Sequence, residues 1–221
     1  PEEFQVNLQL CKKDFRQDWE ANSMGFSQYD NLPRQFSDFL IAQVGAKVAE
    51  KVEQNIWQGA TANAGEFDGF QALLAADSDV VDVSGTTLSK SNIITELDKV
   101  VDAIPSGVYN KEDLKIYIPT SAAKFYIQAQ AALGYRDLYN VGKTDLNFQG
   151  IDLFVAPGLG ANKIVAAESS NLFFGTGLLN DWQEVKLIDM ADIDGSQNVR
   201  VVLRGSAGVQ HGIGSDIVLY S

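Results

Sequence analysis

Apolar and polar positions along the chain predict a mixture of helices and strands, and one helix is much the longest. In residues 32–57 apolar side chains recur at every fourth position, namely Phe36, Leu40, Val44, Val48, Val52 and Ile56. Pro33 suits the first turn of a helix, and Asp30 or Asn31 can cap it. A spacing of four drifts by about 40° per step on a helix of 3.6 residues per turn, so the stripe winds around the helix. We therefore expect its parts to pack on different partners, other subunits among them; a core helix of a monomer is the alternative.

The first residues predict a half-buried strand, because residues 4–10 alternate strictly between apolar and polar side chains. Such a strand needs a partner, which can lie upstream, downstream or in another chain. The sequence begins inside this strand and without an initiator methionine, so we interpret it as a processed product or a fragment.

The rest of the chain predicts shorter elements in blocks. Helical spacing predicts a helix at 93–104, capped by Ser89 or Ser91. A further helix, capped by Pro119-Thr120-Ser121, is predicted to run to Leu133. Residues 67–74 form a short apolar element. Apolar runs predict strands at 80–83, 114–118, 151–156, 163–167, 172–174, 182–188, 199–203 and 217–219.

Turn signals connect these elements at two places. Pro157-Gly158-Leu159-Gly160 predicts a tight turn between strands, and Asp192-Ile193-Asp194-Gly195 predicts a hairpin turn. Since the helices and strands do not alternate as a regular βαβ repeat, the pattern indicates an α+β fold with antiparallel pairing toward the C-terminal end.

Composition excludes several classes of protein. The chain has 221 residues, 45% of them hydrophobic, which is enough for one large domain or two small ones. A net charge of −12 disfavours a grip on nucleic acid or on an anionic membrane surface. No run of about 18 apolar residues predicts a membrane span, and no signal peptide opens the chain. One cysteine excludes an internal disulfide.

Candidate chemistry is weak, so we predict no catalytic, cofactor or metal site. The only histidine, His211, and the only cysteine, Cys11, have no motif around them. Asp189, Asp192 and Asp194 faintly resemble a calcium loop but lack its alternating ligands and terminal glutamate. The Gly158-Leu159-Gly160 run lacks the third glycine and the lysine of phosphate-binding loops. No spacing singles out a pair among the 29 acidic residues.

The order of these elements resembles the major capsid proteins of tailed bacteriophages with the Hong Kong 97-type fold. The resemblance covers nearly the whole chain and is one of order and local pattern rather than of an invariant signature. The stretches that carry it are 55–59 at the end of the long helix, 115–125, 148–157, 163–175, 199–204 and 212–219.

The resemblance implies a fold with two lobes. A peripheral domain, residues 1–69 and 181–221, would hold the long spine helix. An axial domain, residues 70–180, would hold a central mixed sheet with flanking helices. Residues 1–13 would be the returning arm of the extended loop, whose outgoing arm would lie upstream. Subunit contacts are then expected at Phe4, Val6, Leu8, Arg34, Lys47, Lys51, Tyr135 and Tyr139.

The implied function is that of a structural subunit of an icosahedral phage or prophage capsid, without enzymatic activity. Copies would assemble into pentamers and hexamers in the bacterial host cytoplasm and enclose double-stranded DNA without sequence-specific contact. Scaffold, portal and prohead protease are further implied partners, the membrane is not one, and the virion is the final location. The alternatives are an encapsulin-like nanocompartment shell protein and an α+β enzyme with an unrecognised acidic site.

Overall fold

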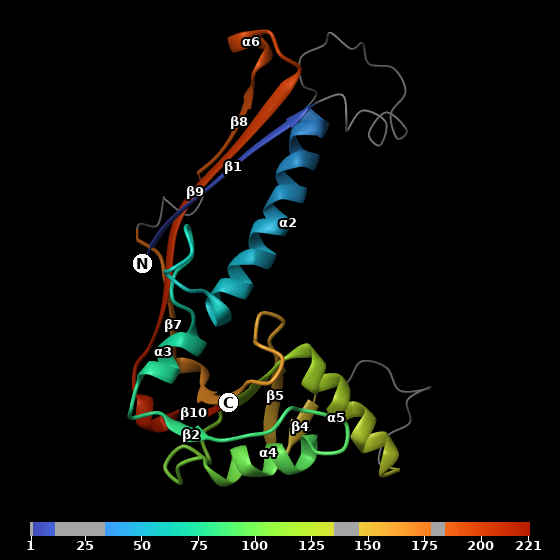
Figure 1. The fold of residues 1–221 in the computed structure, drawn as a ribbon, viewed down its shortest axis with the longest axis vertical. Coiled ribbons are helices and arrows are strands. Elements are labelled where there is room, and N and C mark those ends of the chain that lie inside the picture. Colours follow the sequence, from blue (N-terminus) through green and yellow to red (C-terminus); the bar gives the residue numbers. More distant parts are fainter. Residues whose placement is uncertain (1, 12–33, 135–145, 178–183) are drawn as a thin grey trace. The chain divides into compact units, whose positions relative to one another are not determined.

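A computed structural model describes residues 2–11, 34–134, 146–177 and 184–221 (Figure 1). Its helices are α2 (Arg34–Gln58), α3 (Phe70–Ala76), α4 (Ile93–Asp102), α5 (Thr120–Ala132) and α6 (Ala191–Asp194), with short 3₁₀ turns at Ser169–Asn171 and Gly214–Asp216. Its strands are β1 (Glu2–Cys11), β2 (Val81–Val83), β3 (Leu114–Ile118), β4 (Leu146–Phe148), β5 (Ile151–Val155), β6 (Ile164–Glu168), β7 (Leu172–Gly175), β8 (Glu184–Asp189), β9 (Asn198–His211) and β10 (Val218–Tyr220). The predicted α+β class is confirmed.

The chain forms two compact units. Unit 1 comprises residues 1–52 and 176–207, and unit 2 comprises residues 53–175 and 208–221. The division falls within α2 and within β9, so it differs from the boundaries at 69/70 and 180/181 expected from the sequence. The peripheral and axial domains concern the assembled shell and remain a prediction.

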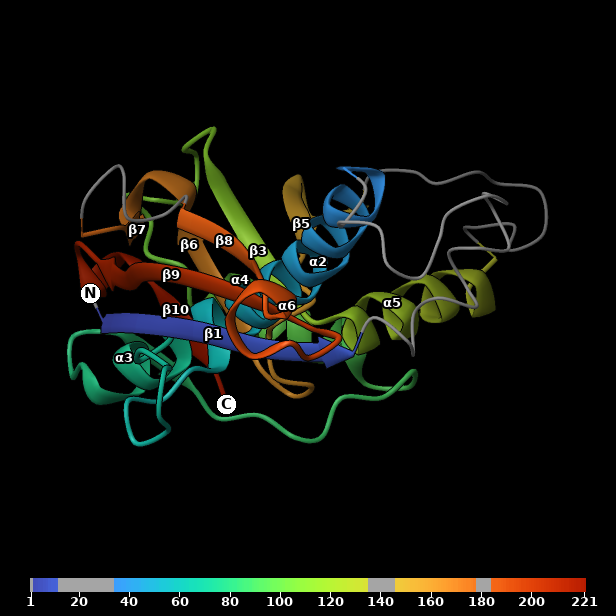
Figure 2. The same cartoon turned by 90° about the horizontal axis from the view of Figure 1, so that it is seen from above.

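In unit 1 a sheet of three strands is built around β9. β1 pairs antiparallel with β9 along its whole length, and β8 pairs antiparallel with the other edge of β9; Figure 1 and Figure 2 both show β1 lying along β9. The partner that the sequence left open for the first strand is therefore a downstream strand of the same chain. Leu40 of α2 packs on Val199, Leu10 and Leu187, which share one face of this sheet.

In unit 2 a mixed sheet carries strands in the order β2-β10-β6-β3-β5-β4. Two pairs, β2 with β10 and β3 with β5, are parallel, and the others are antiparallel. Both faces are covered: Ile116 and Ile164 belong to the core under α4 and α5, whereas Val165 belongs to a second core with Trp57 and Phe70. Burial on both faces explains why these strands read as continuous apolar runs.

The cap predicted for the second helix is wrong. Asn92, not Ser89 or Ser91, is the N-cap of α4, and its side chain makes no capping hydrogen bond to the helix. The Asn92 Oδ1 atom instead accepts hydrogen bonds from the backbone N–H of Ser89, at 2.7 Å, and from its hydroxyl, at 2.8 Å. Ser89 thus stabilises the turn before the helix rather than the helix end itself.

The turn between β5 and β6 is confirmed and packs on the C-terminal end of α2. A Cβ atom at Gly158 would lie 2.2 Å from the backbone oxygen of Glu53, so only glycine fits there. The Nε2 atom of Gln58 donates a hydrogen bond of 2.6 Å to the Gly158 carbonyl oxygen. The glycine signal in the sequence therefore reflects a close approach of two backbones.

The predicted hairpin at 192–195 is also confirmed. α6 joins β8 to β9, and Gly195 after it has φ +71°, the left-handed conformation that glycine adopts at low cost. Asp189 and Asp194 accept hydrogen bonds from the backbone N–H groups of Ala191 and Ser196, as turn-forming aspartates do.

Candidate subunit-contact surfaces

The first candidate surface is the edge of β1. Among the described strands β1 has only β9 as a partner, so no described strand lies along its other edge, and such an edge can pair with a further strand. Phe4, Val6 and Leu8 lie on one face, where Phe4 and Val6 are half-buried and Leu8 is 40% exposed. Phe4 already packs on Gly205, where an added Cβ would come within 2.8 Å of its ring. Leu8 is the most accessible of the three predicted contact residues.

The second candidate surface is the polar side of α2. Lys47 is exposed and donates a hydrogen bond of 2.8 Å to Glu50 Oε2 one turn along the helix, so this ammonium group is partnered within its own helix. Lys51 is also exposed. Arg34 opens α2, and its side chain lies outside the described part, as do Tyr135 and Tyr139. The contact roles of all eight predicted residues remain predictions.

Gly45 lies in the middle of α2, and a Cβ atom built there meets no described heavy atom within 4 Å. Glycine inside a helix costs about 1 kcal/mol relative to alanine, because the unfolded chain loses more backbone freedom on folding. We therefore expect Gly45→Ala to raise the free energy of unfolding of the isolated subunit by about 1 kcal/mol in urea denaturation. A lower free energy of unfolding would mean that another group occupies this space.

Ile193 is a contact candidate that the sequence interpretation missed. It stands at the end of the β8–β9 hairpin in α6 and is 67% exposed, between the exposed residues Asp192 and Asp194. The available signal was a single large apolar residue inside a predicted polar turn. Phe173 and Ile213 in unit 2 are exposed too, at 55% and 57%.

The two residues considered for nucleophilic catalysis have different partners. Cys11 pairs in register with Asn198 in unit 1. His211 in unit 2 places its Nε2 atom 2.7 Å from Asp77 Oδ2, and its buried Nδ1 atom has no hydrogen-bond partner among the described atoms. Backbone hydrogen bonding from Asp79, and then the bond to His211, hold the pKa of Asp77 below its usual value. Cys11 therefore belongs to unit 1 and His211 to unit 2.

A buried carboxylate joins α4 to β10. Glu96 is 4% exposed and accepts hydrogen bonds from Tyr220 Oη at 2.9 Å, from Thr86 Oγ1 at 3.1 Å and from Lys99 Nζ at 2.9 and 3.0 Å. Burial opposes the charged form, but the hydrogen bonds from Lys99, Tyr220 and Thr86 outweigh it and lower the pKa of Glu96. The Glu96 carboxylate therefore links α4 to β10 and to the loop that contains Thr86, and it stabilises the fold.

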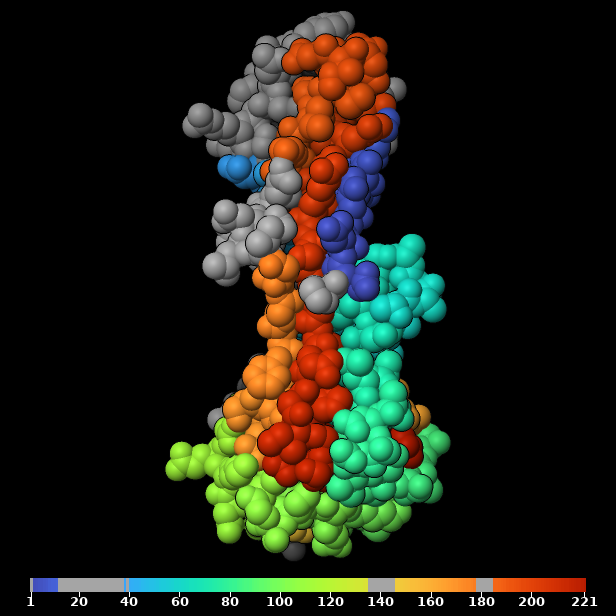
Figure 3. Space-filling view, turned by 90° about the vertical axis from the view of Figure 1, so that its left-hand side faces the viewer, coloured from blue at the N-terminus to red at the C-terminus, as the bar shows by residue number. Residues whose placement is uncertain are grey.

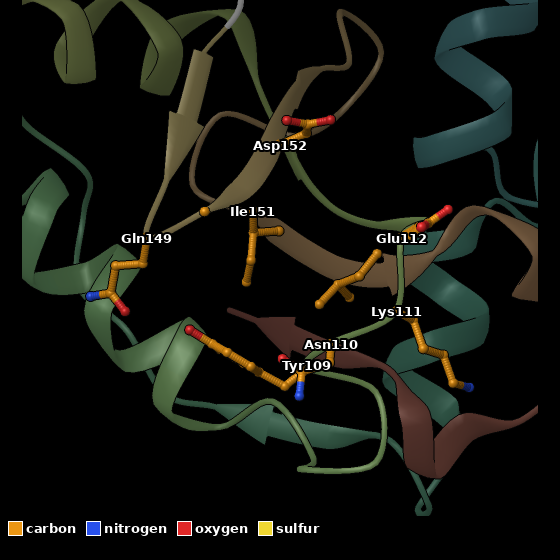
Figure 4. A pocket seen from close by; sticks show the side chains of 9 residues that line it. Tyr109, Asn110, Lys111, Glu112, Gln149, Ile151 and Asp152 are labelled. Atoms are coloured by element: carbon orange, nitrogen blue, oxygen red, sulfur yellow. The ribbon is translucent and has the colours of Figure 1, made fainter.

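A hollow of about 390 Å³ lies where β3 and β5 begin. Leu114 and Ile151 contribute apolar side chains to it, and Glu112 and Asp152 are the acidic residues of its lining. Figure 4 shows the carboxyl groups of Glu112 and Asp152 apart from each other rather than converging on one point.

Two further features bear on function. In the described ranges, no three residues among His, Cys, Asp and Glu are grouped so that they could hold a metal ion. Within the same ranges, no helix combines the length and the apolar character needed to cross a bilayer.

Solved structures match the chain over its whole length. The capsid of an empty GTA particle matches with a TM-score of 0.68 and 12% sequence identity, over 99% of this chain and 72% of that chain. The capsid of cyanophage A-1(L) matches with a TM-score of 0.63 and 12% identity, over 100% and 77%. The chain has the Hong Kong 97-type capsid fold.

The chain also matches the structure of an encapsulin complex. The holo-SrpI encapsulin complex from Synechococcus elongatus matches with a TM-score of 0.57 and 13% identity, over 100% of this chain and 73% of that chain. No model of a protein family matches the sequence, and no curated protein does. At these identities the similarity establishes the fold, and the function requires its own argument.

Proposed function

We propose that this protein is a structural subunit of an icosahedral phage or prophage capsid, which self-assembles into pentamers and hexamers around double-stranded DNA. The observation that carries the proposal is the match of the whole chain to capsid subunits of the Hong Kong 97-type fold. Scaffold, portal and prohead protease would be transient partners in the bacterial cytoplasm, and the virion would be the final location.

Two physical features agree with this proposal. β1 carries an exposed leucine and an edge without a strand partner among the described strands, which is the kind of surface that pairs with another chain. The net charge of −12 suits a subunit that encloses DNA without gripping it, since a cationic surface would be needed for counterion release.

An encapsulin-like shell is the second candidate, and the match to the holo-SrpI encapsulin complex favours it. Both candidates predict closed particles and differ in what the particles contain. The hollow of about 390 Å³ gives no support to the enzyme alternative, because the carboxyl groups of Glu112 and Asp152 in its lining do not converge.

The test is to express the full-length protein together with its neighbouring genes and to examine the product by negative-stain electron microscopy. We expect closed shells of uniform diameter. Shells that package DNA when a terminase is supplied support the capsid, whereas shells that contain a cargo enzyme support the encapsulin. If only small soluble particles form, even with protease and scaffold supplied, the proposal of a shell subunit is wrong.

A further inference from the structure

A hollow with an apolar floor and a cationic rim lies on the unit 1 sheet. Lys186, Ile188, Val202 and Arg204 line a space of about 130 Å³. The register of β8 and β9 places all four on the face opposite the one that carries Val199 and Leu187, on which α2 packs. Figure 3 looks onto the sheet from the side away from α2, with β1 in blue and β9 in red.

The character of this hollow is unusual for a solvated sheet face. Ile188 and Val202 are half-buried apolar residues at positions where alternation would place polar ones, and Arg204 is exposed with no hydrogen-bond or ion-pair partner among the described residues. Arg200, beside Ile188 in register, donates to Gln9, while its buried Nε atom lacks a partner. Apolar floor and cationic rim together suit an aliphatic side chain that is flanked by a carboxylate.

The same hairpin carries a segment with the matching chemistry. Ile193, at 67%, has the largest exposed fraction among the large hydrophobic residues of the described part. Asp192 before it is exposed and has no hydrogen-bond partner among the described atoms, whereas Asp194 accepts a hydrogen bond from Ser196. An aliphatic side chain held out at the end of a hairpin beside a carboxylate is the complement of the hollow.

We propose that the end of the β8–β9 hairpin of one copy inserts into this hollow on a second copy. Ile193 packs on Ile188 and Val202, and Asp192 forms an ion pair with Arg204. The occupant is a second copy because both complementary surfaces belong to this chain, and because an acidic chain needs a cationic patch to associate with itself.

This contact joins two different patches and is therefore heterologous. Repeated from copy to copy, it generates a ring wherever the rotation closes. The inference rests on the proposed function, since it assumes that copies associate, and it specifies one contact of that association.

The test uses disulfide trapping between two variants of the full-length protein, each with Cys11→Ser. Protein with Ile193→Cys is mixed with protein with Val202→Cys, assembled and oxidised. We expect a disulfide-linked heterodimer on a non-reducing gel, which can arise only between copies. Thr61→Cys, in an exposed turn of unit 2, replaces Ile193→Cys as the control and should give at least tenfold less product.

Charge reversal provides the second measurement. Asp192→Arg and Arg204→Asp should each reduce the yield of particles at least tenfold, and the double variant should restore it, because the pair is re-formed with exchanged signs. Circular dichroism melting of the unassembled subunits should be unchanged, since both side chains are exposed. Particles that form normally in all variants and give no heterodimer overturn this contact and leave the shell proposal standing. Absence of any assembly in the parent protein overturns both.

Discussion

Gly158→Ala is expected to lower the free energy of unfolding by about 3 kcal/mol, one of the largest effects of a single methyl group in this chain. The added Cβ would lie 2.2 Å from the oxygen and 2.8 Å from the carbon of the Glu53 carbonyl, which are backbone atoms within α2. Neither partner can move away by rotating a side chain. Overpacking of this kind costs about 1–3 kcal/mol, and the hydrogen bond from Gln58 to Gly158 adds about 1 kcal/mol if it is lost.

Thermal unfolding followed by circular dichroism is a suitable measurement. For a chain of this size a loss of about 3 kcal/mol lowers Tm by about 6–12 °C. Gly107→Ala is the matched control, because a Cβ atom there meets nothing within 4 Å. Equal melting temperatures of the two variants would show that the turn and α2 are not in contact in solution.

Glu96→Gln is expected to lower the free energy of unfolding by about 2 kcal/mol at neutral pH. The carboxylate accepts hydrogen bonds from three side chains, and an amide can replace only one of its two oxygens as an acceptor. Its NH₂ group would face the donors on Lys99, Thr86 or Tyr220. An unsatisfied buried donor costs about 1–3 kcal/mol.

The pH dependence of this difference has a definite sign. Because the folded protein lowers the pKa of Glu96 from its ordinary value of 4.5, the ionised carboxylate stabilises the fold above that value. This stability is lost as the pH falls through the lowered pKa of the folded state. Urea denaturation of the wild type and of Glu96→Gln should therefore differ by a constant amount between pH 7 and about pH 5.5, and the difference should shrink below about pH 4.5.

Glu112→Gln is the control for this series, since Glu112 is exposed. It should leave the unfolding curve at pH 7 unchanged. A difference between the wild type and Glu96→Gln that persists undiminished at pH 3 would show that the charge of Glu96 does not contribute to stability.

Local elements were predictable because their signals are local. Pro33 and the spacing from Phe36 to Ile56 predict the long helix, and strict alternation predicts β1. The fold class followed from their order. The partner of β1 did not, because its pairing with residues almost 200 positions away depends on which surfaces remain after both elements form.

The difference between local signals and long-range contacts also applies to single residues. Gly158 is recognisable in the sequence as a turn residue, but its approach to Glu53 joins elements about 100 positions apart. In the sequence, Glu96 resembles any other acidic residue on the surface of a helix. Its burial is explained by Tyr220 in β10 and by Thr86 in the loop before α4, both of which donate hydrogen bonds to it. Among contact candidates, Leu8 was expected from the resemblance and its contact role remains a prediction, whereas Ile193 was overlooked because turn chemistry alone accounts for its neighbours.

The position of β10 has a consequence for synthesis. Val218–Tyr220 lie between β2, at the edge of the unit 2 sheet, and β6, and they are synthesised after every other strand of that sheet. Until then β2 lacks the strand that attaches it, and the apolar surface that β10 covers stays open to solvent. The complete sheet of unit 2 should therefore form only after β10 has been synthesised, and until then the exposed apolar surface should make the nascent chain prone to aggregation.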